Sequence, residues 1–240
     1  MDEYPLALVT GSGHRLGRIF ALTMARHGYA VLLHYHHSSE SVESTADEIR
    51  ALRVPAYPVK ADLTIAAQIQ SLFSTLDSLN LRLRVLINSA AIMVHSNLRT
   101  TTRKDWDTSL NLNLRAPFLL AQGAVERMVG GGLIVNVTDA GAGKSWTGFP
   151  AYVVSKMGLE ALTRLQAKSY APTIRVNAIA PGLVLPPMDI SNEEWERLVN
   201  RLPLRHSTSV DEIAGALEFL LANESVTGQT LMIDGGYSLT

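Results

Sequence analysis

The feature that most constrains the fold is a regular alternation of short apolar runs with longer segments of helical periodicity. The apolar runs have the length of buried strands and lie at residues 6–10, 30–34, 56–60, 85–88, 133–138, 174–180 and 230–233. The segments with helical periodicity lie at residues 15–28, 41–52, 66–79, 103–129, 150–170 and 211–221. Strands that are apolar along their whole length are buried on both faces. The order therefore predicts an α/β fold, namely a single-domain, Rossmann-type, doubly wound parallel sheet in a three-layer αβα arrangement.

Composition narrows the class of protein further. The chain has 240 residues, a net charge of −1 and no cysteine, which excludes disulfides and thiolate metal sites. Acidic and basic residues are interspersed, so we expect neither a nucleic acid nor a membrane as partner. No apolar run approaches the roughly 20 residues that span a bilayer. The first residues carry acids where a signal peptide carries bases, so we expect a cytoplasmic protein with one domain over residues 1–240.

A glycine-rich turn joins the first predicted strand to the first helix. It reads Thr10-Gly11-Ser12-Gly13-His14-Arg15-Leu16-Gly17. Glycines at such a turn let the backbone approach a pyrophosphate, whose charge is met by the free amides at the helix N-terminus. Tight packing of strand against helix is the alternative explanation, but a turn of this kind at the start of a βαβ unit favours a dinucleotide-binding site.

The end of the second strand, about 20 residues on, is where such folds choose between cofactors. An NAD site would place a carboxylate there, whereas this chain has His34, Tyr35, His36, His37 and Ser38. Together with Arg15, these groups suit a 2′-phosphate, so we predict NADP(H) as the cofactor. The three histidines lack a clear fourth ligand for zinc, and we predict no metal site.

Two further strand ends offer cofactor contacts. Asp62, followed by Leu63, ends the third strand, where a carboxylate can accept a hydrogen bond from an adenine amino group; an N-cap or Asx turn is the alternative. The fourth strand ends in Asn88-Ser89-Ala90, whose small residues either let the cofactor lie close or serve helix packing.

The candidate catalytic residues follow in the second half of the chain. Tyr152 and Lys156 are four residues apart on one helix face, so the ammonium can stabilise a phenolate and lower the pKa of the tyrosine. This pair suits proton delivery during carbonyl reduction. Asp139, thirteen residues upstream, and Asn113 complete the candidate set, and the combination is improbable by chance.

With these motifs, the sequence resembles the short-chain dehydrogenase/reductase family from Thr10 to the final Asp234-Gly235-Gly236. The resemblance implies that Tyr152 donates the proton, that Lys156 holds the nicotinamide ribose, and that Asn113 positions a relay water. It also implies cofactor contacts from Pro181, Gly182 and Leu183.

Asp139 is a departure, because the family ordinarily has serine there. Aspartate resembles the pteridine reductase branch, which includes dihydromonapterin reductases. The other shared features are Arg15, His34-Tyr35-His36 before a serine, Asn113-Leu114-Arg115-Ala116-Pro117-Phe118, Pro181-Gly182-Leu183 and the ending Asp234-Gly235-Gly236-Tyr237-Ser238-Leu239. A second departure is Met93, at the position where that branch usually has an aromatic residue for stacking the pterin.

The sequence therefore predicts an NADPH-dependent reductase of pterins of the dihydrobiopterin or dihydromonapterin type, with a small-molecule substrate. We expect substrate contacts from Arg15, Met93, Asp139, Tyr152 and Leu183, and a substrate lid at about 184–205 within a long irregular stretch. A short-chain carbonyl or alcohol oxidoreductase, of 3-oxoacyl or sugar type, is the first alternative, which Met93 and Pro186-Pro187-Met188 favour. A non-catalytic NADP-binding sensor or scaffold is another. The family resemblance implies a homotetramer that pairs through the helices at 103–129 and 150–170.

Overall fold

The computed structural model describes residues 4–187 and 190–240. Residues 1–3 of the predicted domain and residues 188 and 189 of the predicted lid, Met188 among them, lie outside the described residues. One parallel sheet of seven strands forms the centre, in the order β3-β2-β1-β4-β5-β6-β7. The strands are β1 Leu6–Val9, β2 Ala30–Tyr35, β3 Ala56–Lys60, β4 Leu83–Asn88, β5 Gly132–Val137, β6 Ile174–Pro181 and β7 Thr230–Ile233.

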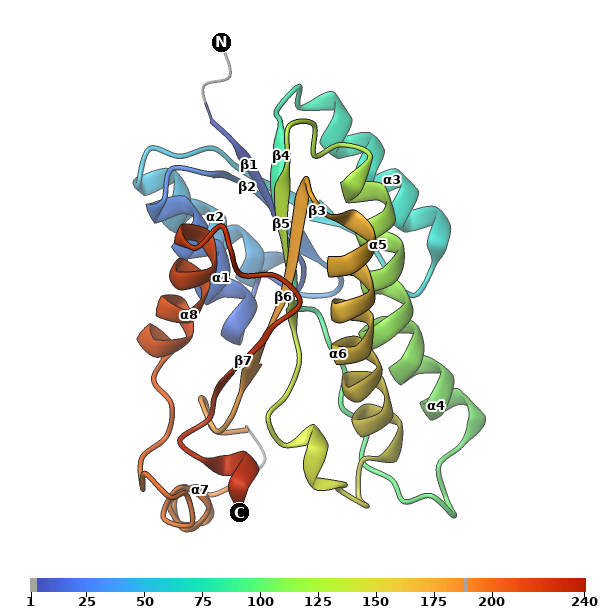
Figure 1. Ribbon diagram of the computed structural model, residues 1–240, viewed down its shortest axis with the longest axis vertical. Helices are drawn as coiled ribbons and strands as arrows, with labels where there is room; N and C mark the ends of the chain where they lie inside the picture. Colours follow the sequence, from blue (N-terminus) through green and yellow to red (C-terminus); the bar gives the residue numbers. More distant parts are fainter. Residues whose placement is uncertain (1–3, 188–189) are drawn as a thin grey trace.

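Helices cover both faces of this sheet (Figure 1). One face carries α1 Arg15–Arg26, α2 Ser39–Ala51 and α8 Val210–Ala222. The other carries α3 Ala66–Ser78, α4 Arg103–Leu110, α5 Ala116–Val125 and α6 Pro150–Tyr170. The predicted three-layer, doubly wound fold in a single domain is confirmed, and every predicted strand is present within two residues at each end.

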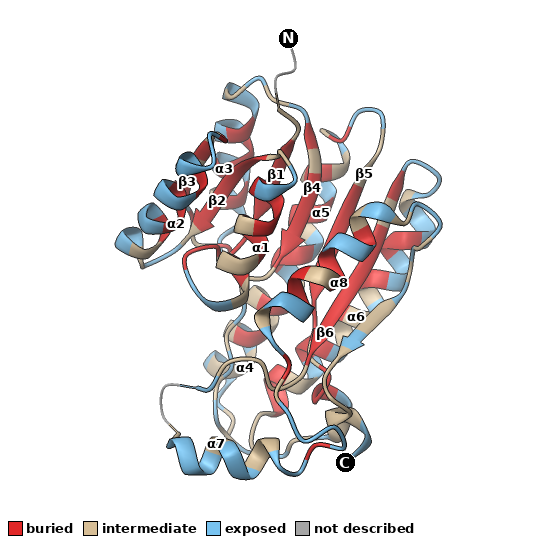
Figure 2. Ribbon diagram, turned by 90° about the vertical axis from the view of Figure 1, so that its left-hand side faces the viewer, coloured by how far each residue is buried: buried red, intermediate tan, exposed pale blue. Residues whose placement is uncertain are grey.

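The sheet is buried on both sides, as the apolar runs require (Figure 2). Two separate apolar clusters form, and successive residues of one strand alternate between them. Ala7 and Val9 of β1 pack against α1 and α8, whereas Leu6 and Leu8 pack toward α3 and α5. Since successive strand residues point to opposite faces, the continuous apolar run of β1 supplies both layers of the core.

The helix predicted near 103–129 runs without a break from Arg103 to Val125, but its middle is wound differently. The helix α4 passes into a π-helical turn, η1 Asn111–Arg115, before α5 begins and ends at Val125. Pro117 supplies a reason: proline has no backbone N–H, so it cannot bond to the carbonyl of Asn113. Single π-helical turns inside α-helices often occur at functional sites, and this one carries Asn113.

The stretch expected to be irregular after β6 also contains a helix, α7 Asn192–Val199. The sequence signals that start this helix are its N-cap and the charge of its first turn. Ser191 accepts a hydrogen bond from the amide of Glu194 as N-cap, and Glu193 and Glu194 place negative charge in the first turn. Trp195, Leu198 and Val199 also stand at i, i+3 and i+4, the spacing of one helix face, so the sequence carried a helical signal here that the prediction of an irregular stretch overlooked.

The strand order reverses at β1, so the connections leaving β1 and β4 diverge and open a crevice at the carboxyl ends of the strands. Ligands of doubly wound sheets bind at such a point. Among the described residues, no helix is long and apolar enough to cross a membrane.

Candidate active site

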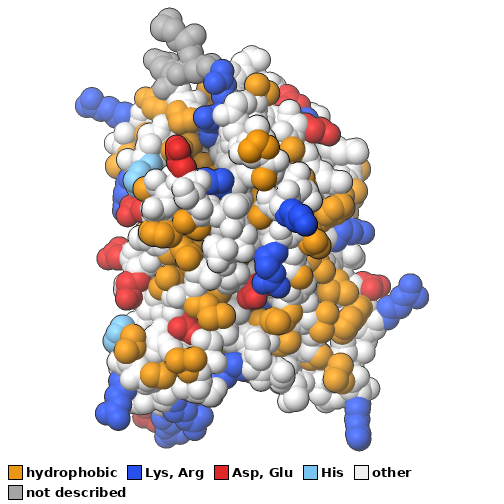
Figure 3. Space-filling view, viewed as in Figure 1, with side chains coloured by type: hydrophobic (Ala, Val, Ile, Leu, Met, Phe, Trp, Pro, Cys, Tyr) orange, Lys and Arg blue, Asp and Glu red, His pale blue; other side chains and the backbone are white. Residues whose placement is uncertain are grey.

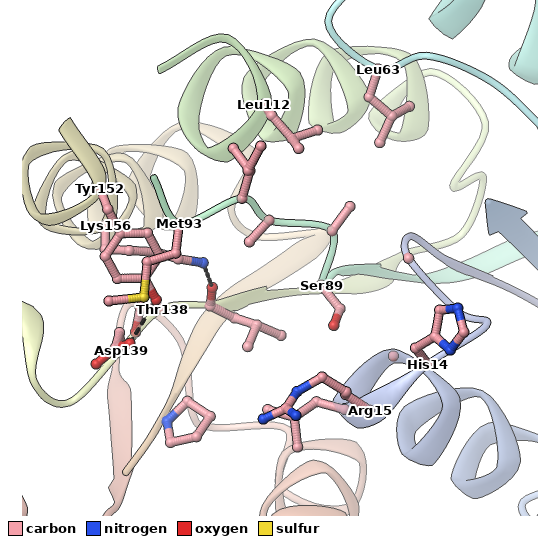
Figure 4. Close-up of a pocket in the computed structure, with 18 of the residues that line it drawn as sticks. His14, Arg15, Leu63, Ser89, Met93, Leu112, Thr138, Asp139, Tyr152 and Lys156 are labelled. Atoms are coloured by element: carbon pink, nitrogen blue, oxygen red, sulfur yellow. Dashed lines mark hydrogen bonds between the residues drawn. The ribbon is translucent and has the colours of Figure 1, made fainter. Parts of the chain in front are cut away.

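A cavity of about 1270 Å³ lies at this crevice. Pockets for drug-sized ligands span about 300–1000 Å³, so the space admits a dinucleotide and a substrate together. Figure 4 shows His14 and Arg15 on one side of the cavity and Met93, Tyr152 and Lys156 on another. The predicted site residues that line it are Gly11, His14, Arg15, Leu16, Gly17, His34, His36, His37, Asp62, Leu63, Ser89, Ala90, Met93, Asp139, Tyr152, Lys156, Pro181, Gly182 and Leu183.

The glycine-rich turn is built for close backbone approach. Gly11 has a φ of 66°, and a Cβ added there would lie 3.0 Å from the Cα of Ala90. A Cβ on Gly17 would lie 2.0 Å from the carbonyl oxygen of Gly11, so the first turn of α1 packs directly on the loop. His14, the N-cap of α1, makes no side-chain capping bond. The first amides of the helix are thus left for an anionic ligand, which fits a pyrophosphate.

His34 has a structural task that the sequence did not reveal. The amide of Gly11 donates to its Nδ1 at 3.2 Å, so its Nε2 carries the proton and donates to the carbonyl of Ala61 at 2.9 Å. Burial lowers the pKa of His34 to about 4, which makes it neutral near pH 7. Both ring nitrogens are thus occupied by backbone groups, so we expect the predicted 2′-phosphate contact from its neighbours.

Those neighbours are His36 and His37, whose ring centroids lie 3.6 Å apart at the end of β2. His36 Nε2 lies 3.9 Å from Asp62 Oδ2. The other carboxylate oxygen of Asp62 accepts from the amide and hydroxyl of Thr64, so the Asx turn considered as an alternative is present. These hydrogen bonds to Thr64 are the largest cause that lowers the pKa of Asp62. Gly13, Tyr35 and Ser38 do not line the cavity.

Asp139 and Tyr152 form an acid pair in the cavity. The Tyr152 hydroxyl donates to Asp139 Oδ2 at 2.6 Å, and the amide of Gly141 donates to Asp139 Oδ1 at 2.7 Å. The tyrosine projects from the first turn of α6, whereas the aspartate follows the end of β5. Asp139 and Tyr152, thirteen residues apart in the sequence, are therefore in direct contact.

The pKa of Tyr152 moves in the direction opposite to the prediction. Burial raises it well above its usual value, and the charge of Asp139 and the hydrogen bond to it raise it further. Burial likewise raises the pKa of Asp139, against the hydrogen bonds from Tyr152 and Gly141. The sequence argument counted the ammonium but missed the carboxylate at hydrogen-bond distance. The pair consequently favours its protonated forms.

Lys156 is buried behind the tyrosine. Its Nζ donates to the carbonyl of Val137 at 2.7 Å and lies 5.7 Å from the ring centroid of Tyr152. Burial lowers the pKa of Lys156 to about 8, although Asp139 opposes the shift. The ammonium is therefore held at a fixed place beside the pair.

Asn113 and Asn88 are buried close to the cavity but do not line it. Asn113 donates to the carbonyl of Ile92 at 2.8 Å and to Ser155 Oγ at 3.0 Å, and its Oδ1 accepts from the amide of Ile92. It thereby fixes the segment that carries Met93. Asn88 donates to Asn136 Oδ1 at 2.8 Å, which ties β4 to β5. The hydrogen bonds of Asn113 and Asn88 therefore hold the backbone around the site in place.

Sequence reasoning missed part of the cavity wall. Trp146, from the loop after β5, and Tyr237, from the C-terminal turn, line the cavity together with Trp195 of α7. No local pattern identifies them, because they meet only in the folded chain. The one indication was Tyr237 itself, which stood in the C-terminal motif behind the family resemblance.

Arg15 connects the glycine-rich turn to the predicted lid. Its guanidinium donates to the carbonyls of Leu185 at 2.8 Å and Pro186 at 3.0 Å. A further backbone bond runs from Thr208 to the carbonyl of Leu183 at 2.9 Å. The described start of the predicted lid is thus held over the cavity from both ends.

Comparisons with known proteins agree with this fold. Residues 12–238 match a family model described as enoyl-(acyl carrier protein) reductase. The chain belongs to the short-chain dehydrogenase/reductase family, and the prediction of an oxidoreductase of this family is confirmed.

Individual relatives divide between two activities. The chain is 31% identical over 237 residues to the 3-oxoacyl-(acyl-carrier-protein) reductase FabG of Staphylococcus aureus, covering 96% of each protein. It is 34% identical to a putative ketoacyl reductase of granaticin polyketide synthase from Streptomyces violaceoruber, covering 99% of this chain and 97% of the relative. Among solved structures, FolM alternative dihydrofolate reductase 1 from Brucella canis, complexed with NADP, is similar with a TM-score of 0.93 and 31% identity, covering 100% of this chain and 96% of that one.

Proposed function

We propose that the protein is an NADPH-dependent reductase of pterins, of the dihydrobiopterin or dihydromonapterin type. The observation that carries the proposal is the 2.6 Å hydrogen bond between Tyr152 and Asp139 in the cavity wall. A serine at position 139 would orient a ketone oxygen, whereas a carboxyl group can both hold a proton and pair with the amino-pyrimidine edge of a pterin.

The cofactor is NADP(H), as the structural neighbours bound to NADP or NADPH and the family support. The residues of the cavity fit it, since the first amides of α1, which no side chain caps, would hold its pyrophosphate, and no acid ends β2. When bound, NADPH supplies a hydride to the ring carbon of a C=N bond. The chain must then deliver one proton to the ring nitrogen.

Tyr152 is the group we assign to that delivery, because its high pKa keeps the phenol protonated near pH 7. Asp139 can return a proton to the phenolate from its carboxyl form, in which it donates to the Tyr152 oxygen and becomes the carboxylate; burial, by raising the pKa of Asp139, favours that form. Lys156, beside the pair, stabilises the negative charge that moves between the two oxygens. We assign Asn113 a positioning role through Ile92 and Ser155.

The FolM neighbours, whose name states an alternative dihydrofolate reductase, support a substrate with a pterin ring. The FabG relatives support a 3-oxoacyl substrate equally well in identity and coverage. Met93, which is 44% exposed and flexible, favours this second candidate, because an acyl chain packs on it as readily as a ring. Asp139 favours the pterin, since a ketone oxygen needs only the hydroxyl that serine would supply. Neither comparison favours a sugar-type oxidoreductase or a non-catalytic sensor.

Purified protein with NADPH, dihydrobiopterin or dihydromonapterin, followed by loss of the reduced nicotinamide absorbance, tests the proposal. We expect turnover with at least one pterin and weaker turnover with acetoacetyl thioester. Turnover of the thioester alone would establish the 3-oxoacyl alternative. Absence of turnover with either pterin would refute the proposal while leaving the family unchanged.

We also propose that residues 184–205 form a substrate lid, which the contacts of Arg15 and the place of Trp195 in the cavity wall support. A cytoplasmic location stays a prediction.

A homotetramer is our proposal for the assembly. The apolar side chains of the α5 and α6 side support it (Figure 3). Phe118, Val154, Met157 and Leu165 are exposed there, and a shallow apolar groove runs between α5 and α6. Light scattering after gel filtration should give four times the 26.1 kDa chain mass. Phe118→Lys should lower that mass, and a monomeric wild type would refute the assembly.

A further inference from the structure

Trp146 and Tyr237 form an aromatic wall of the cavity that the catalytic assignment does not use. Their ring centroids lie 6.0 Å apart at 51°. Burial raises the pKa of Tyr237, and the charge of Asp139 raises it further, whereas the indole of Trp146 lowers it. Both rings are half-buried, and both line the same cavity as Asp139 and Tyr152.

The chain holds this wall rigidly. Lys144 places its Nζ 3.9 Å from the ring centroid of Tyr237 and donates to the Tyr237 carbonyl at 3.1 Å and to Thr240 Oγ1 at 2.8 Å. Phe149 contacts Trp146 edge-on at 6.3 Å between centroids. One lysine thus fixes the C-terminal turn against the loop that carries the indole.

Gly141 shows how close the wall is to the acid pair. A Cβ on Gly141 would lie 2.1 Å from Cζ2 of Trp146 and 2.8 Å from Cε1 of Tyr237, so both rings pack on its bare backbone. The amide of the same glycine donates to Asp139 at 2.7 Å. The aromatic wall and the carboxyl group are therefore held by a single residue.

We infer that Trp146, braced by Tyr237, is a specificity-determining residue that packs against the planar ring of the substrate and selects ring substrates over acyl chains. The inference rests on the proposed function for the identity of the ring. In this account Trp146 supplies the aromatic surface that Met93 does not provide. A rigid indole loses little entropy when a flat ring packs on it, and aromatic pairs contribute about 0.5–1.5 kcal/mol beyond the area they bury.

The test uses Trp146→Ala and Trp146→Phe, with Trp106→Phe as a matched control, since Trp106 of α4 does not line the cavity. Steady-state kinetics with dihydromonapterin and with acetoacetyl thioester should show a KM for the pterin about 10-fold higher in Trp146→Ala, which corresponds to about 1.4 kcal/mol. Its kcat should change little, and the thioester KM should stay within about twofold. Trp146→Phe should restore most of the loss, and Trp106→Phe should behave as wild type.

Ligand binding separates this inference from the proposed function. Pterin binding to the NADP-loaded protein, measured by titration calorimetry for the wild type, Trp146→Ala and Trp106→Phe, reports the contact without turnover. Binding without turnover that weakens about 10-fold in Trp146→Ala alone would refute the proposed function and uphold the wall. Turnover with an unchanged pterin KM in Trp146→Ala would overturn the wall and leave the function intact. If the protein neither binds nor turns over a pterin, both the proposed function and the aromatic wall are refuted. Thermal unfolding of each variant checks that it is folded.

Discussion

Lys156 provides the prediction whose size the structure defines best. The residue is 3% exposed, and its ammonium donates a hydrogen bond to the carbonyl of Val137. Replacing it with methionine, which fills a similar volume, removes a buried charge and a titratable group from the core. We expect Lys156→Met to lose activity and, below pH 8, to be at least as stable as the wild type.

The magnitude follows from the pKa of Lys156, which falls from 10.5 in the unfolded chain to about 8 in the folded one. Each unit corresponds to about 1.36 kcal/mol, so keeping the buried amine charged costs about 3 kcal/mol well below pH 8. The lost bond to Val137 offsets about 1 kcal/mol of the gain in the variant.

The pH dependence has a definite sign. Between about pH 8 and 10.5 the unfolded chain still binds the proton and the folded chain does not, so wild-type stability rises with pH. Relative to Lys156→Met, the wild type should gain about 2 kcal/mol from about pH 7 to about pH 9.5.

Urea unfolding of both proteins at several pH values measures this difference. Lys168→Met is the matched control, because Lys168 is exposed on the same helix, α6. Its stability difference from the wild type should stay flat with pH. A flat difference for Lys156→Met as well would refute the reasoning, since the buried amine would then titrate as it does in the unfolded chain.

Three other replacements test separate parts of the site. Asp139→Ser should lower kcat/KM for dihydromonapterin by about 100-fold or more while sparing acetoacetyl thioester, because it removes the acid and keeps a hydroxyl; Asp139→Asn is its shape control, and equal losses for both substrates would contradict the acid role. His36→Ala combined with His37→Ala should lower kcat/KM for NADPH by about 10-fold or more and leave NADH unchanged, since charge-assisted bonds to a phosphate are lost; an unaltered NADPH preference would exclude these histidines. Arg15→Met should speed hydrogen exchange of the Thr208 amide, which donates to the carbonyl of Leu183, by about 10-fold, because both guanidinium bonds to the neighbouring carbonyls of Leu185 and Pro186 disappear; unchanged exchange would show that the lid is held elsewhere.

The sequence predicted the parts of the fold that depend on local periodicity. The buried strands were found within two residues, because a continuous apolar run bounded by turns has few other solutions in a chain of this order. The π-helical turn at Asn111–Arg115 was missed. Pro117 favours it by lacking the backbone N–H that would bond within an α-helix, and this leaves the helical period of the apolar residues unchanged.

In the candidate site, too, sequence pattern predicted the features that depend on local spacing and missed those that depend on tertiary packing. Tyr152, Lys156 and Asp139 could be chosen from spacing, and the structure places them together. The direction in which the pKa of Tyr152 shifts could not be predicted, because it depends on burial and on the carboxylate of Asp139, which follows the end of β5. His34 was placed correctly on the cavity wall, yet its task is set by two backbone partners from distant segments, Gly11 and Ala61. Trp146 and Tyr237 lie about ninety residues apart in the chain and meet only through tertiary packing.

The most direct test of the central claim, that Tyr152 and Asp139 protonate a ring nitrogen, is a competition between substrates. Wild-type protein with limiting NADPH and equal concentrations of dihydromonapterin and acetoacetyl thioester is allowed to consume all the reductant, and the products are separated and quantified. The account predicts that tetrahydromonapterin takes most of the reducing equivalents. A preponderance of the hydroxyacyl product would contradict it.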